Sequence, residues 1–488
     1  MTDSLQPAEI TDDDNAEAAF PAFANRREKA AMACLSLVIS AAYLDVFFEV
    51  GMAIGAASLA LLVYFLLCWN ALSRVTRFLL SLAIATFSAA FWFDVNGPTI
   101  LDGLSRMIFL SALLSVLGLL RSAAAKAREV ADAGAFLTSQ PPGRRYLALT
   151  VGGHIFGTLI NLGGLAILLD MTTRALARER GNMSVYVSEW RLRRMTLAII
   201  RGFSLISLWS PLGFAINIVL LNIPDLQLVE IAPIGLAATF LLIGMGWTFD
   251  YFGSPRRSRG LGTSGTQGGL GPVFLLFLHV LVLGGAVIAV EELSALSFQK
   301  ALLLVVPLYC LFWSFLQARS VYGTVSTMAA TVSTTVRRFP ASASEVGVFA
   351  SAGLLAVIVL ALIPMPWLQD KIIGLSLDPA LIVVTMSLTV YALCCIGINP
   401  IITASILGSL AYALDLPGLS SLAAALALLG GWGSAIPFSP FITTVVYTGA
   451  LIGRSPVEVG MRWNGPYSLT MLILWSSILS LAVYLGWV

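Results

Sequence analysis

Long apolar segments separated by short polar connections occupy most of this 488-residue chain. A helix needs about 20 apolar residues to cross roughly 30 Å of hydrocarbon. The segments that come close to this length lie at 31–48, 51–69, 78–95, 100–120, 195–222, 227–248, 272–292, 300–318, 345–365 and 465–487. The pattern therefore predicts an all-α polytopic membrane protein.

The glycine-rich apolar region 146–171 is not a simple span, because arginines lie on both of its flanks. Lys and Arg in short loops remain on the cytoplasmic side of a membrane. We therefore expect this region to enter from the cytoplasm and return to it as a re-entrant hairpin.

The apolar region 380–452 is too long for one span and is interrupted by polar and proline-containing sequences. Counting the crossings onward puts residue 366 outside, so 380–416 is expected to form a second hairpin that opens to the outside. Residues 418–452 then cross inward with a break at Ser439-Pro440. The prediction is about eleven transmembrane helices plus two re-entrant hairpins.

Two Ser-Pro pairs indicate an internal repeat. Ser210-Pro211 and Ser439-Pro440 lie in similar surroundings, and a Val-Glu pair follows each of them at nearly the same distance. A hairpin precedes each pair, and the two hairpins are expected to open to opposite sides, which makes the repeat inverted. A broken helix in each half of an inverted repeat is typical of secondary transporters, which bind their substrate where the breaks meet.

The repeat divides most of the chain into five parts. The chain begins with a cytoplasmic disordered tail at 1–29, which is followed by N-terminal scaffold helices at 30–120. The first repeat, at 121–248, contains the inward-opening hairpin 146–171 and the broken helix 195–222. Second scaffold helices follow at 272–365, and the second repeat, at 366–488, contains the outward-opening hairpin 380–416 and the broken helix 418–452. The tail lacks the apolar core of a signal peptide. We therefore expect a cytoplasmic N-terminus and, after an odd number of spans, a C-terminus outside.

Composition narrows the class of protein further. Only 11% of the residues are charged and 58% are hydrophobic, whereas a soluble domain carries about 25% charged residues. The net charge of +2 argues against a nucleic-acid partner, and the two histidines and five cysteines show no metal-ligand spacing. There is no phosphate-binding glycine loop with a lysine. The sequence thus indicates no enzyme, no cofactor and no metal other than an alkali cation.

The helix breaks carry the candidate binding residues. Proline removes an amide donor, and the carbonyl groups it frees are tolerated only inside protein or beside water. Oxygen atoms of this kind suit an alkali cation, and the amino ends of half-helices suit an anion. The predicted breaks are at Gly153, Pro211, Gly397, Pro400 and Pro440, and the candidate substrate- and ion-binding residues are Asn161, Ser207, Ser210, Asn217, Asn399, Thr403, Ser405, Ser434, Ser439, Thr443 and Thr444. The alternative is that the prolines only kink their helices and that these polar groups join helices to one another.

Two charged or titratable residues are candidate partners for a substrate or a proton. Arg201 lies inside an apolar segment and either offsets an anionic substrate or extends to the cytoplasmic headgroups. His154, at the expected tip of the first hairpin, is either a proton carrier or substrate donor, or a hydrogen-bonded structural histidine.

With its eleven spans, opposed hairpins and two Ser-Pro breaks, the chain resembles the ion transporter superfamily over residues 31–488. This superfamily includes divalent-anion/sodium symporters and the large membrane subunits of TRAP transporters. The symporters' Ser-Asn-Thr signatures are absent from both expected tips, which read Gly-His-Ile at 153–155 and Ile-Asn-Pro at 398–400. The resemblance implies an elevator-type carrier, in which a scaffold holds a moving unit of hairpins and broken helices.

We therefore expect a secondary active transporter of small organic anions, carboxylates above all, that is coupled to Na⁺ or H⁺. The alternatives are a channel or a membrane subunit of a binding-protein-dependent carrier, with a periplasmic binding protein as partner, and an exporter of a lipid or glycan intermediate. The expected partners are membrane lipid, a small anionic substrate and a second copy in a homodimer. The expected location is the inner membrane.

Overall fold

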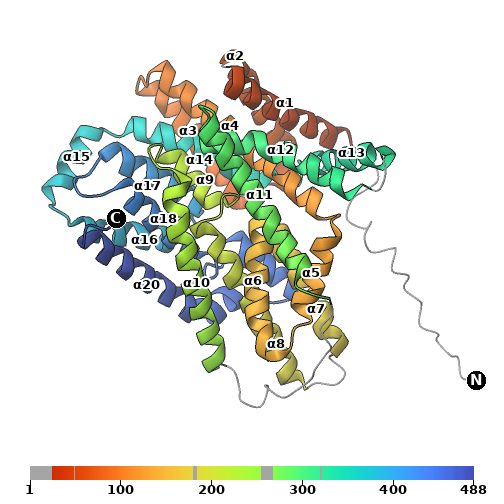
Figure 1. Ribbon diagram of the computed structural model, residues 1–488. Coiled ribbons are helices and arrows are strands. Elements are labelled where there is room, and N and C mark those ends of the chain that lie inside the picture. The colour runs from red at the N-terminus through yellow and green to blue at the C-terminus, as the bar shows by residue number, and fades with distance from the viewer. Residues whose placement is uncertain (1–24, 49, 180–183, 254–267, 319–320) are drawn as a thin grey trace, which may run out of the picture.

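The computed structural model describes residues 25–488 except 49, 180–183, 254–267 and 319–320, and every regular element in this part of the chain is a helix (Figure 1). Most of the expected tail lies outside the described residues. The first helix begins at Arg26, inside the range 1–29 that the sequence assigned to the tail. The end of that tail was therefore placed a few residues too late.

Eight helices of the described part are long and apolar enough to cross a membrane. They are α1 (Arg26–Phe48), α3 (Arg74–Trp92), α4 (Gly97–Ala124), α10 (Leu228–Gly253), α11 (Gly271–Leu293), α12 (Phe298–Gln317), α14 (Ala343–Leu362) and the continuous helix Glu458–Tyr484, in which the π-helical η5 (Glu458–Asn464) leads into α20 (Gly465–Tyr484). Large apolar side chains on their outer faces, such as Phe240 and Phe274, are exposed, as expected for contact with lipid. The all-helical polytopic architecture is confirmed, and the count of eleven spans remains a prediction.

Several helices differ from the segments expected from hydropathy. The apolar segment 51–69 forms the 16-residue α2 (Met52–Leu67). The sequence did not indicate α5 (Arg128–Thr138), α13 (Val321–Arg337) or α15 (Met365–Gly374). These three helices are short or rich in Ser and Thr, so a measure based on apolar length does not detect them.

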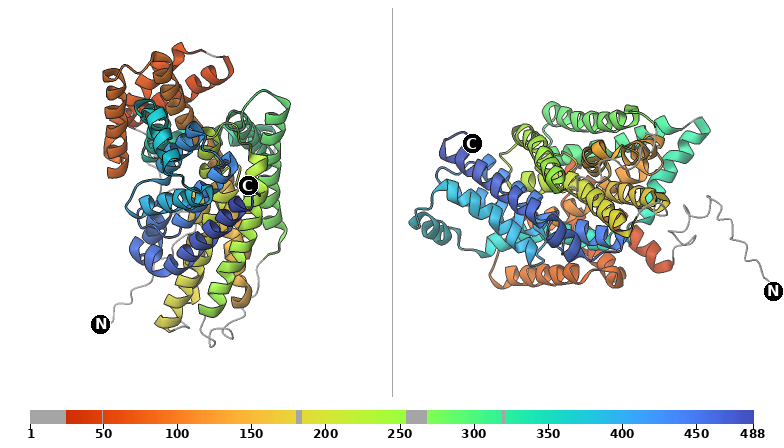
Figure 2. Two further views of the ribbon diagram at one scale, coloured as in Figure 1. Left: turned by 90° about the vertical axis from the view of Figure 1, so that its left-hand side faces the viewer. Right: turned by 90° about the horizontal axis from the view of Figure 1, so that it is seen from below.

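The scaffold is built around the contact between α4 and α14. Gly353 of α14 lies against the backbone of Arg106 of α4, where a Cβ atom would come within 2.7 Å of the carbonyl oxygen. Tyr64 of α2 donates a 2.6 Å hydrogen bond to the carbonyl oxygen of Phe339, which holds the turn between α13 and α14 in place. In the left panel of Figure 2, the red helices α1–α3 and the yellow-green helices α8–α10 occupy different sides of the molecule.

Two helical hairpins occur where the sequence predicted them. The first consists of α6 (Pro142–Ile160) and α7 (Leu162–Glu179), and the second of α16 (Pro379–Cys395) and α17 (Pro400–Leu414). The predicted break at Gly153 is wrong, because α6 continues through it and the turn lies at Asn161. Gly153 instead allows close helix packing, since a Cβ atom there would overlap the carbonyl group of Ile199 in α8.

Both predicted broken helices are interrupted at their Ser-Pro pairs. The first consists of α8 (Val185–Ser204), the 3₁₀ turn η3 (Leu205–Leu208) and α9 (Phe214–Asn222), and the second of α18 (Ser421–Ala435) and α19 (Thr443–Ile452). Each proline lies in the non-helical connection, where its missing amide donor leaves no helical hydrogen bond unmade. The chain is thus non-helical at Pro211 and Pro440, and Gly397 and Pro400 lie at the turn of the second hairpin.

The two hairpins open toward opposite ends of the first broken helix. Near the start of this helix, Arg194 donates a 3.0 Å hydrogen bond to the carbonyl oxygen of Pro142, at the open end of the first hairpin. At its other end, Asn222 accepts a 2.7 Å bond from Ser409 in the returning arm of the second hairpin. In Figure 1, α8 reaches the lower edge and α9 lies in the upper half. The inverted repeat and the re-entry of either hairpin into a membrane remain predictions.

Candidate functional site

The turn of the first hairpin consists of a single residue, Asn161, with φ 54° and ψ −135°. This backbone conformation is uncommon for residues other than glycine and is tolerated best by Asn and Asp. Gly164 lets the two arms meet closely, because a Cβ atom there would overlap the carbonyl group of Phe156. The turn therefore places the Asn161 side chain at the point where the two arms join.

The break at Pro211 is held together by Asn217. Its Nδ2 donates to the carbonyl oxygens of Pro211 at 3.1 Å and Gly213 at 2.9 Å, so the amide partners two carbonyl groups at the break. The Oδ1 atom of Asn217 and the Oγ atom of Ser210 are buried without a hydrogen-bond partner among the described residues. Buried polar atoms are normally partnered, so these two oxygens are open to a ligand.

The turn of the second hairpin is formed by Gly397, with φ 96°, and by Asn399, which caps α17. The Oδ1 atom of Asn399 accepts a 2.9 Å bond from the amide of Ile401, and Ser405 donates back to the carbonyl oxygen of Ile401 at 2.7 Å. The Oγ1 atom of Thr403 is buried without a partner in the described part of the chain. The amide nitrogen of Asn399 is left for other contacts.

The second break is tied to the second hairpin. Ser439 donates a 2.6 Å bond to the carbonyl oxygen of Cys394 and accepts one of 3.3 Å from the amide of Phe441. Ser434, five residues earlier, has a buried hydroxyl group that none of the described residues partners. Ser439 therefore has a structural role at this break, whereas the Ser434 hydroxyl group could contact a ligand.

A cavity of about 520 Å³ lies where these four features meet. Gly433 of α18 faces Ser207, whose Oγ atom would lie 2.7 Å from a Cβ atom at that glycine, so the two broken helices are in contact. Among the predicted binding residues, those that line the cavity are Asn161, Ser207, Asn399, Thr443 and Thr444. Those buried outside its lining are Ser210, Asn217, Thr403, Ser405, Ser434 and Ser439. The amino ends of α9, α17 and α19 also reach the cavity, at Phe214, Pro400 and Thr443.

His154 is fully hydrogen-bonded. Its Nε2 atom accepts a 3.0 Å bond from the indole nitrogen of Trp209, so Nδ1 carries the proton and donates to the carbonyl oxygen of Gly202 at 3.1 Å. The residue lies within α6, about two turns from the hairpin turn, and lines neither this cavity nor the one described below. These contacts favour the structural role for His154.

Arg201 is likewise engaged. Its guanidinium donates to Asn464 at 3.1 Å and to the hydroxyl of Tyr146 at 3.0 Å, and it lies 4.5 Å from the centre of the Tyr467 ring. The side chain is buried and lines neither cavity. It joins α8 to α6 and to the continuous helix of η5 and α20, which favours a structural role over both roles considered from the sequence.

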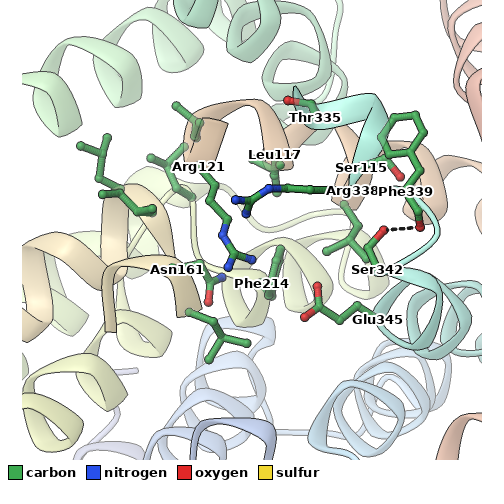
Figure 3. A pocket seen from close by; sticks show the side chains of 18 of the residues that line it. Ser115, Leu117, Arg121, Asn161, Phe214, Thr335, Arg338, Phe339, Ser342 and Glu345 are labelled. Carbon is green, nitrogen blue, oxygen red and sulfur yellow. Dashed lines mark hydrogen bonds between the residues drawn. The ribbon is translucent and has the colours of Figure 1, made fainter. Parts of the chain in front are cut away.

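A second cavity of about 120 Å³ adjoins the first and shares Asn161, Leu162, Phe214 and Glu345 with it. Arg121 and Arg338 also line it, and Figure 3 shows both guanidinium groups and the Glu345 carboxylate directed into it. From the sequence alone, these arginines are interpreted only as markers of the cytoplasmic side of the membrane. Glu345, an acidic residue at the start of the apolar segment 345–365, is the feature of the sequence that could have indicated this charged cavity.

No group of three or more His, Cys, Asp or Glu side chains suited to a metal ion is found in the described part of the chain. Neither a protein-family model nor a curated protein matches the sequence. Among solved structures, the chain is similar to the YdaH transporter of Alcanivorax borkumensis, whose crystal structure was reported to reveal an unusual topology. The identity is 17%, the match covers 84% of this chain and 89% of the other, and the TM-score is 0.49.

Proposed function

We propose that this protein is a secondary active transporter of small organic anions, carboxylates above all, driven by a Na⁺ or H⁺ gradient. The observation that carries the proposal is the meeting of two opposed hairpin turns and two helix breaks at one cavity of about 520 Å³. Binding sites of secondary transporters are built from broken helices of inverted repeats.

The lining of the cavity supports an anionic substrate. The amino ends of α9, α17 and α19 face it, and the partial positive charge at a helix amino end favours an anion. The hydroxyl groups of Thr443 and Thr444 and the amide of Asn399 supply donors for a carboxylate.

The buried oxygen atoms beside the cavity support coupling to a cation. Ser210, Asn217, Thr403 and Ser434 each have a side-chain oxygen that no described residue partners. Uncharged hydroxyl and amide oxygens suit a weakly held alkali ion such as Na⁺. We propose that the hairpins and broken helices carry the bound ion and substrate across the membrane against the scaffold of α1–α4 and α11–α14.

The decisive experiment is uptake of radiolabelled carboxylates into proteoliposomes with an imposed Na⁺ or H⁺ gradient. We expect uptake that an ionophore abolishes and that Thr444→Ala lowers, with Thr385→Ala as matched control, since Thr385 is exposed on α16 and bonds only to its own helix. Flux that ignores both gradients and requires ATP would contradict the proposal. Uptake only after addition of a periplasmic binding protein would favour the binding-protein-dependent carrier instead.

The proposal includes a homodimer in the inner membrane with a cytoplasmic N-terminus and an external C-terminus. The location of the termini is tested below by labelling, and the oligomeric state by light scattering of the detergent-solubilised protein.

A further inference from the structure

Three charged side chains from the scaffold converge on the smaller cavity (Figure 3). Arg121 lies in the last turn of α4, Arg338 follows the last residue of α13, and Glu345 lies in the first turn of α14. None of them belongs to the hairpins or to the broken helices. The scaffold therefore brings its own charged groups to the binding region.

Arg121 reaches the turn of the first hairpin. A Cβ atom at Gly163, two residues beyond the turn, would lie 2.9 Å from the Nε atom of Arg121, so the glycine provides the space in which this side chain lies. Asn161 lines both cavities. A substrate held at the hairpin turn would therefore be within reach of the scaffold arginine.

Arg121 and Glu345 are not joined to each other by an ion pair in the described part of the chain. Within the described part of the chain, no ion pair with an N···O distance of 4.0 Å or less joins Arg121 or Glu345 to any residue. In Figure 3 the guanidinium groups of Arg121 and Arg338 lie on one side and the Glu345 carboxylate on another, with space between them. Arg121 and Glu345 are exposed and Arg338 is partly exposed, so all three charged groups are accessible from the cavity. A ligand with two opposite charges would compensate both sides.

The chemistry of the groups defines that ligand. Guanidinium groups bind carboxylates with paired, charge-assisted hydrogen bonds, and a carboxylate accepts bonds from an ammonium group. We infer that the cavity binds a substrate with both a carboxylate and an ammonium group, as an amino acid has, with the carboxylate at Arg121 and Arg338 and the ammonium group at Glu345. This inference rests on the proposed function and narrows its substrate class from organic anions to amino-acid-like molecules.

The test compares amino acids with their des-amino analogues: alanine with propionate, leucine with 4-methylpentanoate, phenylalanine with 3-phenylpropionate, and glutamate with glutarate. Binding to the purified full-length protein is measured by calorimetry, which does not require transport. We expect at least one amino acid to bind about tenfold more tightly than its analogue, the effect of one charge-assisted hydrogen bond. Glu345→Gln should weaken binding of that amino acid alone, whereas Arg121→Gln should weaken binding of both members of the pair.

Two variants at the same end of the scaffold serve as controls for charge. Lys126→Gln and Asp132→Asn remove exposed charges that line neither cavity, and we expect both to bind like the wild type. Melting temperatures without ligand identify any variant that fails to fold. In that case, Arg121→Lys and Glu345→Asp, which keep the charge, replace the first pair and should weaken the same ligands to a smaller degree.

The outcomes separate the two proposals. Equal or tighter binding of the des-amino analogues, or a Glu345→Gln variant that weakens both members of a pair equally, would overturn the inference. If carboxylates are then taken up along an ion gradient, the proposed function stands without it. If an amino acid binds with the expected preference but no gradient drives its uptake, the binding site stands and the transport function fails.

Discussion

Ser439 and Cys394 join the second helix break to the second hairpin. The Ser439 hydroxyl donates a 2.6 Å hydrogen bond to the Cys394 carbonyl oxygen, near the end of α16, across 45 residues of sequence. Both residues are buried. The bond therefore holds the break against the first arm of the hairpin.

Ser439→Ala should therefore lower stability as well as function. The substitution removes one of the bonds to the Cys394 carbonyl oxygen, which keeps a 3.2 Å bond from the amide of Gly397, and the loss of one hydrogen bond costs about 0.5–1.5 kcal/mol. We expect a lower melting temperature in detergent, measured with and without Na⁺. Ser88→Ala is the control, because Ser88 is exposed and bonds only to its own helix. An unchanged melting temperature for Ser439→Ala would show that the bond contributes nothing to stability.

Asn399 allows capping to be separated from ligand binding. Its Oδ1 atom caps α17, whereas its amide nitrogen is free to face the cavity. Asn399→Ala should cost about 1 kcal/mol of stability through loss of the cap, and Asn399→Ser should restore the cap. We expect Asn399→Ser to melt like the wild type but to bind substrate roughly three- to tenfold more weakly, because a donor is missing. Full affinity in Asn399→Ser would limit Asn399 to capping.

Asn161 is expected to tolerate glycine better than alanine. Its φ of 54° with ψ of −135° is accessible to glycine without strain, whereas sparsely populated backbone angles of this kind cost other residues about 1–3 kcal/mol. Asn161→Gly should keep the melting temperature while lowering uptake, since it removes a polar side chain from both cavities. Asn161→Ala should lower both quantities. If Asn161→Gly transports normally, the side chain serves only the turn.

His154→Gln tests the structural role of the histidine. Loss of the bonds to Trp209 and Gly202 should destabilise the protein, since each of these buried groups would need a new partner. The dependence of uptake on pH between 5.5 and 8 should keep its midpoint. A shifted or flattened pH profile in a variant that still folds would restore His154 as a proton carrier.

The opposed hairpins predict which faces of the membrane are labelled. Tyr186→Cys, near the start of α8, should react with an impermeant thiol reagent only from the cytoplasmic side, and Ile373→Cys, in α15, only from outside. Both side chains are exposed. Cys34 and Cys395, which are partly accessible, are first replaced by Ala. Labelling of both positions from one face would contradict the inverted arrangement.

Local chemistry accounts for only part of the helix breaks. Proline removes a helical hydrogen bond wherever it stands, and the helices are interrupted at the Ser-Pro pairs 210–211 and 439–440, whereas α10 and α12 continue through Pro233 and Pro307. The opposed hairpins could likewise be inferred from arginines beside apolar segments. Short-range chemistry of this kind is contained in the sequence.

The turn of the first hairpin could not be located in this way. Gly153 and Asn161 are both compatible with a turn when the sequence is considered alone, and the choice depends on packing. Gly153 contacts the backbone of α8 inside a straight helix, whereas Asn161 takes the unusual backbone angles. The position of the turn therefore depends on packing against α8, almost fifty residues further along the chain.

The roles of the charged residues depend even more on distant partners. Arg201 is satisfied by Asn464, 263 positions further along the chain, whereas Arg121 shares a cavity with Glu345. A charge within an apolar segment indicates that some partner must exist, since an unpaired charge is costly there. Folding brings the two segments together, and only that contact distinguishes a structural arginine from one that faces a ligand.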